Sequence, residues 1–348
     1  MTRRMVGLDI GYSMMRAAQV SYSKQGVPTI EKLHEVLLPT EILQYGEIRN
    51  PEAFSEYLKT FWKEGDFKTN EVTIAAGDMH VFARELTVPQ MSMQRIRESL
   101  PFLMESVLPV SPELLYFDFY PSEDTVVEGA ASIRGLVVAA EKSNVDLLVN
   151  CVIGAHLRVA TVDFGPFALL RVRLDPKLGS GVNAIVDVGS VATRVVITRG
   201  LTPLFVRVIP TGGQNYDEAL MAALRMSELS AADTKRRLKE PPTDEIDLAA
   251  WTVLQNSIQE FVVSLKSTLD YFEQAHAGEG MKIEQIMMSG GGSHLSGMLE
   301  AVEKVVSIPI IQNGDMSHFQ KSSDIDASNE QLQRMALAIG LAMGAESK

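Results

Sequence analysis

The chain has 348 residues, 46% of them hydrophobic, which is enough to bury a sizeable core in two domains. Its formal net charge of −12 argues against a nucleic-acid-binding face, which is normally basic. The single cysteine, Cys151, excludes a disulfide framework and is typical of a reducing compartment. No apolar run has the length of a signal peptide or of a spanning helix, so we expect a cytoplasmic protein that reaches the inner face of the membrane only through a partner.

The first half of the chain opens with short β-rich runs separated by turn-forming residues, which predict strands. Asn50 and Pro51 then mark the start of a helix over 51–64, because asparagine caps helices and proline is tolerated in the first turn. In a distinct block over 78–140, Pro101 is expected to kink or divide a helix over 92–108. The predicted strands are 5–10, 14–22, 29–38, 71–76, 81–88, 114–120, 133–140 and 157–163, and a further helix covers 143–153.

The second half repeats the opening pattern, with strands predicted at 184–188, 193–199 and 202–209 and a later one at 284–288. A long helix over 248–276 carries apolar residues at steps of three and four, which indicates an amphipathic helix. The other predicted helices cover 215–224, 230–239, 295–305 and 330–343, and 313–329 is predicted to be a polar loop.

Two matching Asp-x-Gly turns stand in these halves. Asp9 and Asp187, 187 − 9 = 178 positions apart, each lie near the end of an apolar run and two residues before a glycine. One such aspartate alone would more readily cap a turn. Two in matched settings instead favour a pair of carboxylates that hold a nucleotide-bound Mg²⁺ through its waters. The repeat predicts a duplicated α/β fold whose halves face one another across a nucleotide cleft.

Other residues of these turns and of later glycine runs are candidates for nucleotide contact. Backbone N–H groups at a glycine turn can bind phosphate, and helix starts attract anions. A run of glycines lets a flat base lie on the backbone. Ordinary glycine loops and solvated basic side chains remain the alternatives. The candidates are Gly11, Tyr12, Ser13 and Arg16 in the first turn, Gly189, Ser190 and Val191 in the second, Gly212 and Gly213, Lys235, and Gly290, Gly291 and Gly292.

The order of these motifs along the chain resembles that of the actin-like ATPase superfamily. Within it, the chain is similar to the PilM family, the cytoplasmic actin-like components of type IV pilus assembly. The segments that carry this resemblance are 86–89 (Leu-Thr-Val-Pro), 105–109 (Glu-Ser-Val-Leu-Pro), 137–140 (Val-Val-Ala-Ala), 162–171 (Val-Asp-Phe-Gly-Pro-Phe-Ala-Leu-Leu-Arg) and 288–297 (Met-Ser-Gly-Gly-Gly-Ser-His-Leu-Ser-Gly).

This resemblance implies ATP or ADP with Mg²⁺, and an FtsA-like arrangement in which 78–140 is a small inserted subdomain. The first actin-like domain would comprise 1–77 and 141–180, and the second 181–345. The implied partner is the N-terminal cytoplasmic tail of the membrane protein PilN, with links to pilus motor ATPases. The tail is expected in a groove near 81–108, which the apolar residues Phe82, Leu86, Ile96, Leu100, Phe102 and Leu103 would line, although helical stripes more often form core.

Two features depart from the superfamily. Its second phosphate motif is often Asp-x-Gly-Gly-Gly-Thr, whereas here Ser190-Val191-Ala192-Thr193 follows the first glycine, which predicts a looser phosphate grip. Gly165 stands where hydrolases carry a polar residue that positions the attacking water, and glycine has no side chain for that task. We therefore expect slow or absent hydrolysis. A sugar-kinase-like phosphotransferase and an FtsA-like cell-division protein are the alternatives, but no motif marks a catalytic aspartate and no amphipathic C-terminal tail is expected.

Overall fold

The computed structural model describes residues 3–24, 26–44, 46–77, 80–108, 110–174, 181–312, 316 and 318–344. The chain divides into two compact units. Unit 1 comprises Met1–Lys177, Leu201–Phe205 and Gly314–Lys348, and unit 2 comprises Leu178–Gly200 and Val206–Asn313. Within the described ranges, no helix combines the length and the apolar character that a membrane crossing requires.

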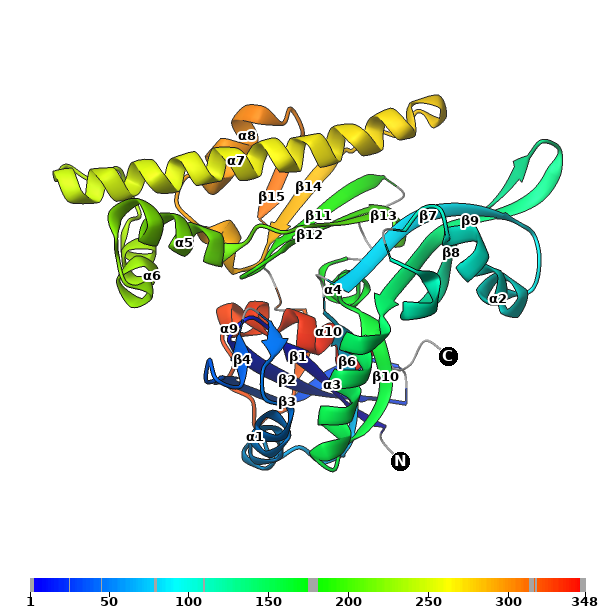
Figure 1. Cartoon of the computed structure of the whole chain (residues 1–348), viewed down its shortest axis with the longest axis horizontal. Coiled ribbons are helices and arrows are strands. Elements are labelled where there is room, and N and C mark those ends of the chain that lie inside the picture. The colour runs from blue at the N-terminus through cyan, green and yellow to red at the C-terminus, as the bar shows by residue number, and fades with distance from the viewer. Residues whose placement is uncertain are drawn as a thin grey trace. The chain divides into compact units, whose positions relative to one another are not determined.

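Unit 1 is built on a six-stranded mixed sheet in the order β10-β6-β1-β2-β3-β16 (Figure 1). β1, β2 and β3 are antiparallel neighbours, whereas β6 pairs with β1, and β10 with β6, in parallel. The register opposes Asp9 to Arg16 across β1 and β2. The strands are β1 (Arg4–Ile10), β2 (Met14–Tyr22), β3 (Pro28–Leu37), β6 (Glu71–Ala76), β10 (Arg158–Phe164) and β16 (Gln320–Lys321), and β4 (Leu43–Gln44) and β5 (Glu47–Ile48) form a small separate ribbon.

Helices cover both faces of this sheet. On one face α1 (Pro51–Glu64) packs against α3 (Lys142–Gly154) over a core that includes Phe54 and Val152. Asn50 caps α1, since its side chain accepts a hydrogen bond from the Ala53 N–H at 3.0 Å. On the other face α4 (Gly165–Arg173), α9 (Asn329–Arg334) and α10 (Ala336–Gly344) share a second core with residues of β2 and β3. The result is a three-layer α/β/α arrangement.

α10 is buried along almost its whole length, which explains its nearly continuous apolar sequence. It contacts β1 and α4 closely because glycines stand at both contacts. A Cβ on Gly7 of β1 would overlap the carbonyl oxygen of Ala338, and a Cβ on Gly340 would overlap that of Ala168 in α4. These two glycines therefore set how near the helix lies to the sheet.

The block between β6 and α3 forms a subdomain with its own sheet and core. Its three strands are ordered β7-β9-β8, and all neighbours are antiparallel. α2 packs on this sheet through Ile96, Leu100 and Met104, which are fully buried with Phe119 and Val137. The elements are β7 (Val81–Pro89), α2 (Met93–Met104), β8 (Leu115–Val127) and β9 (Ala130–Glu141).

Unit 2 is built on a five-stranded sheet in the order β13-β12-β11-β14-β15, of which the first residues of β13, 202–205, are grouped with unit 1. β11 and β12 are antiparallel, with Asp187 opposite Arg194, and β14 and β15 continue the sheet in parallel. The long helix α7 runs along this sheet and packs against α5, α6 and α8 (Figure 1). The elements are β11 (Val182–Val188), β12 (Thr193–Arg199), β13 (Thr202–Ile209), α5 (Gly213–Leu224), α6 (Glu228–Arg237), α7 (Glu245–Ala275), β14 (Gln285–Ser289), α8 (Met298–Val305) and β15 (Ile310–Gln312).

The two sheets have the same topology. In each, the first strand lies between an antiparallel neighbour and a parallel one, within the order β3-β2-β1-β6-β10 in unit 1, which β16 extends beyond β3, and β13-β12-β11-β14-β15 in unit 2. The duplicated α/β fold predicted from the two Asp-x-Gly turns is thereby confirmed. The predicted second domain, 181–345, extends further than unit 2. Its C-terminal part belongs to unit 1 instead, because α9 and α10 pack on the sheet of unit 1.

Several predicted element boundaries need correction. α2 runs through Pro101 and ends at Met104, so proline does not divide it, but the helix stops short of residue 108. Residues 295–297 precede α8, and a 3₁₀ turn over Gly291–His294 replaces the loop expected there. Short strands β4, β5, β15 and β16 were not predicted, because two- and three-residue strands carry too few residues to show a period.

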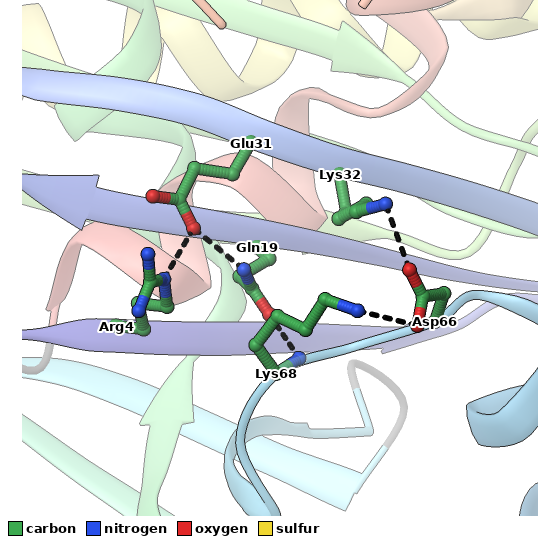
Figure 2. A network of polar contacts seen from close by, with 6 residues as sticks. All are labelled: Arg4, Gln19, Glu31, Lys32, Asp66 and Lys68. Carbon is green, nitrogen blue, oxygen red and sulfur yellow. Dashed lines mark hydrogen bonds and ion pairs between the residues drawn. The ribbon is translucent and has the colours of Figure 1, made fainter. Parts of the chain in front are cut away.

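A polar network ties the loop after α1 to strands β1, β2 and β3 of the unit 1 sheet (Figure 2). The buried Gln19 donates to Glu31 Oε2 at 2.6 Å and accepts from the Lys68 N–H at 2.7 Å. Arg4 also donates to Glu31 Oε2, at 2.8 Å. Partial burial opposes ionisation of Glu31, but the hydrogen bonds from Arg4, Ser21 and Gln19 prevail and lower its pKa below the ordinary value of 4.5.

We expect the Glu31→Gln variant to be less stable than the parent protein at pH 7 by about 1 kcal/mol, the usual order for a lost hydrogen bond. Since folding lowers the pKa of Glu31, its contribution is present above pH 4.5 and is lost as the pH falls through the folded-state value, so the two proteins should converge in acid. Urea unfolding at several pH values measures this. The exposed pair Glu56–Lys59 on α1 supplies the control: Glu56→Gln should change little at any pH. A constant difference for Glu31→Gln down to acid pH would contradict the prediction.

Candidate functional site

The first candidate turn joins β1 to β2 in unit 1. Asp9 is 8% exposed, and its Oδ2 lies 3.8 Å from Arg16 Nη1 on the neighbouring strand. Gly11 N–H donates to the Met14 carbonyl at 2.9 Å and closes the turn over Tyr12 and Ser13. The turn therefore places a carboxylate and a guanidinium side by side where two strands meet.

Arg16 also binds a second carboxylate, that of Glu35 on β3. Its Nε donates to Glu35 Oε2 at 3.3 Å, and Glu35 Oε1 accepts from Arg334 of α9 at 3.0 Å. Burial opposes ionisation of Glu35, but the hydrogen bonds and charges of Arg334 and Arg16 outweigh it and lower its pKa. A line of alternating charges thus runs from Asp9 to α9.

The second candidate turn joins β11 to β12 in unit 2 and has the same construction. Asp187 is 5% exposed, and its Oδ2 accepts from Arg194 Nη1 at 3.2 Å. Gly189 N–H donates to the Ala192 carbonyl at 3.0 Å, as Gly11 does to Met14. Of the predicted contact residues in this turn, Ser190 is exposed and Val191 is half-buried.

Two residues that bind Asp187 from neighbouring strands were not among the predicted site residues. Ser289, at the end of β14, donates to Asp187 Oδ1 at 2.8 Å, because the parallel pairing of β11 and β14 places the two residues opposite one another. Arg194 binds the other carboxylate oxygen of Asp187. The signal for Arg194 was present in the sequence, since it follows Asp187 at the same spacing of seven that separates Arg16 from Asp9.

The glycine run after β14 is packed tightly on β11. Gly290 has φ of +85°, and a Cβ there would overlap the Val188 carbonyl oxygen. A Cβ on Gly292 would overlap the Val188 side chain, whereas one on Gly291 would meet nothing within 4 Å. Gly290 and Gly292 thus serve the packing of this turn, and the open side of Gly291 is the place where a flat ligand can approach the backbone.

The start of α5 uses its amides within the protein. Gly212 N–H donates to Asn215 Oδ1 at 2.8 Å, Gly213 N–H to the Gly189 carbonyl at 2.9 Å, and Gln214 N–H to the Ser190 carbonyl at 2.7 Å. The predicted anion contact through the Gly212 and Gly213 amides is therefore not supported, because both donors are already engaged. The hydrogen bonds to the carbonyls of Gly189 and Ser190 instead hold the start of α5 against the second turn.

Lys235 of α6 is also engaged with α5. Its Nζ donates to Asp217 Oδ2 and to the Gly213 carbonyl, both at 2.6 Å. Burial raises the pKa of Asp217 above its ordinary value, although the Lys235 charge acts in the opposite direction. Lys235 thus fastens α6 to the first turn of α5, next to the backbone of the second candidate turn.

The six residues predicted to line a partner groove fall into two groups. Ile96 and Leu100 are buried in the subdomain core, and Phe82 and Leu86 are half-buried against that core. By contrast, Phe102 is 81% exposed and Leu103 is 43% exposed at the C-terminal end of α2. Phe102 and Leu103 are therefore the most accessible of the six, whereas Phe82 and Leu86 on β7 are half-buried.

Asp9 and Asp187 are the candidate carboxylates for a metal ion in the two turns. Among the described residues, no group of three or more His, Cys, Asp or Glu side chains is arranged to hold a metal ion. Mg²⁺ keeps several waters and is often bound by one or two carboxylates together with phosphate oxygens. Asp9 and Asp187 fit that limited role, each as a single carboxylate at the end of a strand.

The sequence model of the type IV pilus assembly protein PilM family matches residues 7–346. The chain belongs to the PilM family. A sequence search of curated proteins gives no match. Among solved structures, the chain is similar to one in the PilM–PilN type IV pilus biogenesis complex, with a TM-score of 0.83, 23% identity and 99% of each chain covered. Membership in the PilM family confirms the relationship expected from the motif order.

More distant structures share the same fold. One is MreB5 of Spiroplasma citri bound to ADP, with a TM-score of 0.53, 14% identity and coverage of 97% of this chain and 94% of that chain. Another is the ethanolamine utilization protein EutJ from Carboxydothermus hydrogenoformans, with a TM-score of 0.55, 13% identity and coverage of 98% and 89%. These likenesses confirm the actin-like ATPase fold for this PilM-family chain.

Proposed function

We propose that this PilM-family protein is an ATP-binding scaffold of the type IV pilus assembly platform. It would work in the cytoplasm at the inner face of the membrane, bind the N-terminal tail of a PilN-like membrane protein and link it to motor ATPases. The observation that carries this proposal is the family match over residues 7–346. The fold shared with a chain of the PilM–PilN complex supports it. The sugar-kinase and cell-division alternatives are not favoured by that match.

Each half of the duplicated fold, taken by itself, carries proposed nucleotide contacts. The turns after β1 and β11 would meet the phosphates, Asp9 and Asp187 would hold waters of Mg²⁺, and the backbone at Gly291 would lie against the base. The ADP-bound MreB5 supports nucleotide binding by this fold in general. A bound Mg²⁺ would supply charge neutralisation of the phosphates, while the residues of this chain orient them.

We further propose that hydrolysis is slow or absent. Gly165 is buried at the first position of α4, and it offers no side chain with which to position a water. A nucleotide held without turnover would act as a ligand that stabilises one conformation of the scaffold.

Calorimetric titration with ATP and Mg²⁺, followed by a phosphate-release assay on the same sample, tests the proposed activity. Binding with negligible release is the expected result. Rapid release of phosphate would favour an enzyme. If ATP does not bind, the nucleotide part of the proposal fails, and the binding of the PilN-like partner is tested separately.

Gly291→Val should block binding of the base while leaving the fold intact. A side chain at this position points into open space, so it would occupy the volume proposed for the adenine instead of clashing with the protein. We expect ATP affinity to fall at least tenfold with little change in melting temperature. Gly278→Ala, at another open glycine, is the control that should leave affinity unchanged. Normal ATP binding by Gly291→Val would refute the placement of the base.

The partner surface is tested with a peptide of the PilN-like cytoplasmic tail. Phe102→Asp should weaken peptide binding about tenfold or more, because a large exposed aromatic side chain is the kind of residue that dominates interfaces. Its exposure makes folding insensitive to the change. Leu229→Asp is the matched control, since Leu229 is an equally exposed apolar residue on α6 in unit 2. Unchanged peptide affinity for Phe102→Asp would mean that the tail binds elsewhere.

A further inference from the structure

Ser289 is a polar residue at the end of a buried apolar run. It follows Ile286, Met287 and Met288 in β14, and only 4% of its surface is exposed. A buried hydroxyl group requires a hydrogen-bond partner. An apolar residue of similar size would pack at the end of β14 without that requirement, so the hydroxyl group itself calls for an explanation.

The partner of Ser289 is the carboxylate of Asp187. The parallel pairing of β11 with β14 places the two residues opposite one another at the carboxyl ends of their strands, the end at which ligands of open α/β sheets bind. Ser289 Oγ donates to Asp187 Oδ1 at 2.8 Å, and Arg194 donates to Oδ2 at 3.2 Å. Each oxygen of the carboxylate is thus held from a different neighbouring strand, β14 on one side and β12 on the other.

These two hydrogen bonds restrict how the carboxylate can turn. The terminal torsion of an aspartate side chain has broad minima, so its angle depends on the bonds that the two oxygens make. Without the Ser289 hydroxyl, Asp187 would be held by these strands through Oδ2 alone, and its carboxylate could turn about the Cβ–Cγ bond. A hydrogen bond to an ionised carboxylate is stronger than one between neutral groups, which makes this one an effective constraint.

The backbone that carries the Ser289 hydroxyl is itself fixed to the strand of Asp187. A Cβ on Gly290 or on Gly292 would overlap Val188, so the glycine turn lies directly on β11. Ser293 Oγ donates to the Gly290 carbonyl at 2.7 Å and closes that turn. The pairing of β14 with β11 before Ser289 and the glycine turn after it therefore fix the point from which the hydroxyl donates.

We propose that Ser289 is a positioning residue for the nucleotide-bound Mg²⁺, acting through Asp187. Its hydroxyl keeps the carboxylate in the orientation in which it accepts hydrogen bonds from the waters of the metal. Removing a group that orients a metal-binding side chain commonly lowers metal affinity about 10- to 100-fold. This inference rests on the proposed nucleotide binding and adds a residue of β14 to the metal contact of unit 2.

The test measures ATP binding by calorimetry with Mg²⁺ and with a chelator in its place. Ser289→Ala should weaken binding about tenfold in Mg²⁺ and leave the affinity in chelator unchanged. In an Asp187→Ala background, Ser289→Ala should cause no further loss in Mg²⁺, because Ser289 acts through that carboxylate. Ser293→Ala is the matched control, since it removes a buried hydroxyl that donates to the Gly290 carbonyl instead. Any loss in this control should be equal in Mg²⁺ and in chelator.

Folding of unit 2 is checked through the fluorescence of Trp251 on α7 in a Trp62→Phe background, since the chain has two tryptophans. Ser289→Cys, which is close in size and carries a weaker donor, should also lose affinity in Mg²⁺ alone, and it replaces the alanine variant if that variant does not fold.

Several results would overturn the inference. Equal loss in Mg²⁺ and in chelator for Ser289→Ala would show a role in packing alone, and unchanged affinity would show no role. A further loss in the Asp187→Ala background would mean that Ser289 does not act through Asp187. If the parent protein binds ATP equally well with and without Mg²⁺, the inference fails while nucleotide binding stands. If it binds ATP under neither condition, the nucleotide-binding proposal fails and the inference falls with it.

Discussion

Gly340→Ala is expected to destabilise unit 1 by about 3 kcal/mol or more, the upper part of the range for an overpacked core. Its new Cβ would overlap the backbone carbonyl of Ala168, and a backbone atom cannot rotate away as a side chain can. α10 must then separate from α4 and lose part of the core that both share with the sheet. Alanine favours the helical conformation over glycine by about 1 kcal/mol, which offsets only part of this loss.

Fluorescence of Trp62, which follows urea unfolding of unit 1 in a Trp251→Phe background, measures this effect. Trp62 lies on α1 and donates to the Thr69 carbonyl at 3.0 Å, so its surroundings change when unit 1 unfolds. Gly278→Ala, where a Cβ meets nothing within 4 Å, should leave the transition in place. An unchanged or raised midpoint for Gly340→Ala would mean that α10 does not lie as close to α4 as described.

Asp9→Ala and Asp187→Ala are each expected to weaken Mg²⁺-dependent ATP binding by about 10- to 100-fold. This is the usual loss when a group that orients metal ligands is removed. Both carboxylates would act on the metal through its waters, and each also anchors an arginine of the neighbouring strand. Removing either one would therefore take away a proposed Mg²⁺ contact and also release that arginine.

Titrating each protein with ATP in the presence of Mg²⁺, and again with a chelator in place of Mg²⁺, separates the metal-dependent part of the affinity from the rest. The parent protein should lose affinity when the metal is removed, and the two variants should lose much less, because the carboxylate-dependent part is already gone. Glu56→Gln on the outer face of α1 is a charge-removing control far in sequence from both turns. If both aspartate variants bind Mg²⁺–ATP like the parent protein, the carboxylates have no part in a nucleotide site.

Local features were predicted well where the residues that determine them lie close together in the sequence. Asn50 and Pro51 set the start of α1, and the apolar stripe of α7 follows from spacing alone. The two Asp-x-Gly turns predicted a duplicated α/β fold, since each lies between strands whose periodicity is visible in the sequence. The family relationship followed from the order of these same motifs.

Other predictions depended on which surfaces meet, and these needed the structure. Ile96 and Phe102 lie six positions apart on one predicted apolar helix, yet one is in the core and the other is exposed. The sequence predicted an anion contact at Gly212 and Gly213, but in the structure their amides donate to Asn215 Oδ1 and to the Gly189 carbonyl. The hydrogen bond from Ser289 to Asp187 was found only because the pairing of β11 with β14 places these residues opposite one another.

The sequence by itself therefore determined the longer strands, the main helices, the repeat and the family, because periodicity, capping and motif order are properties of neighbouring residues. The tertiary structure decided which apolar face is buried, which amides and cations are already engaged, and where α10 packs. Those outcomes arise from contacts between residues far apart in the chain, such as Gly340 with Ala168 and Ser289 with Asp187, and no local pattern records them.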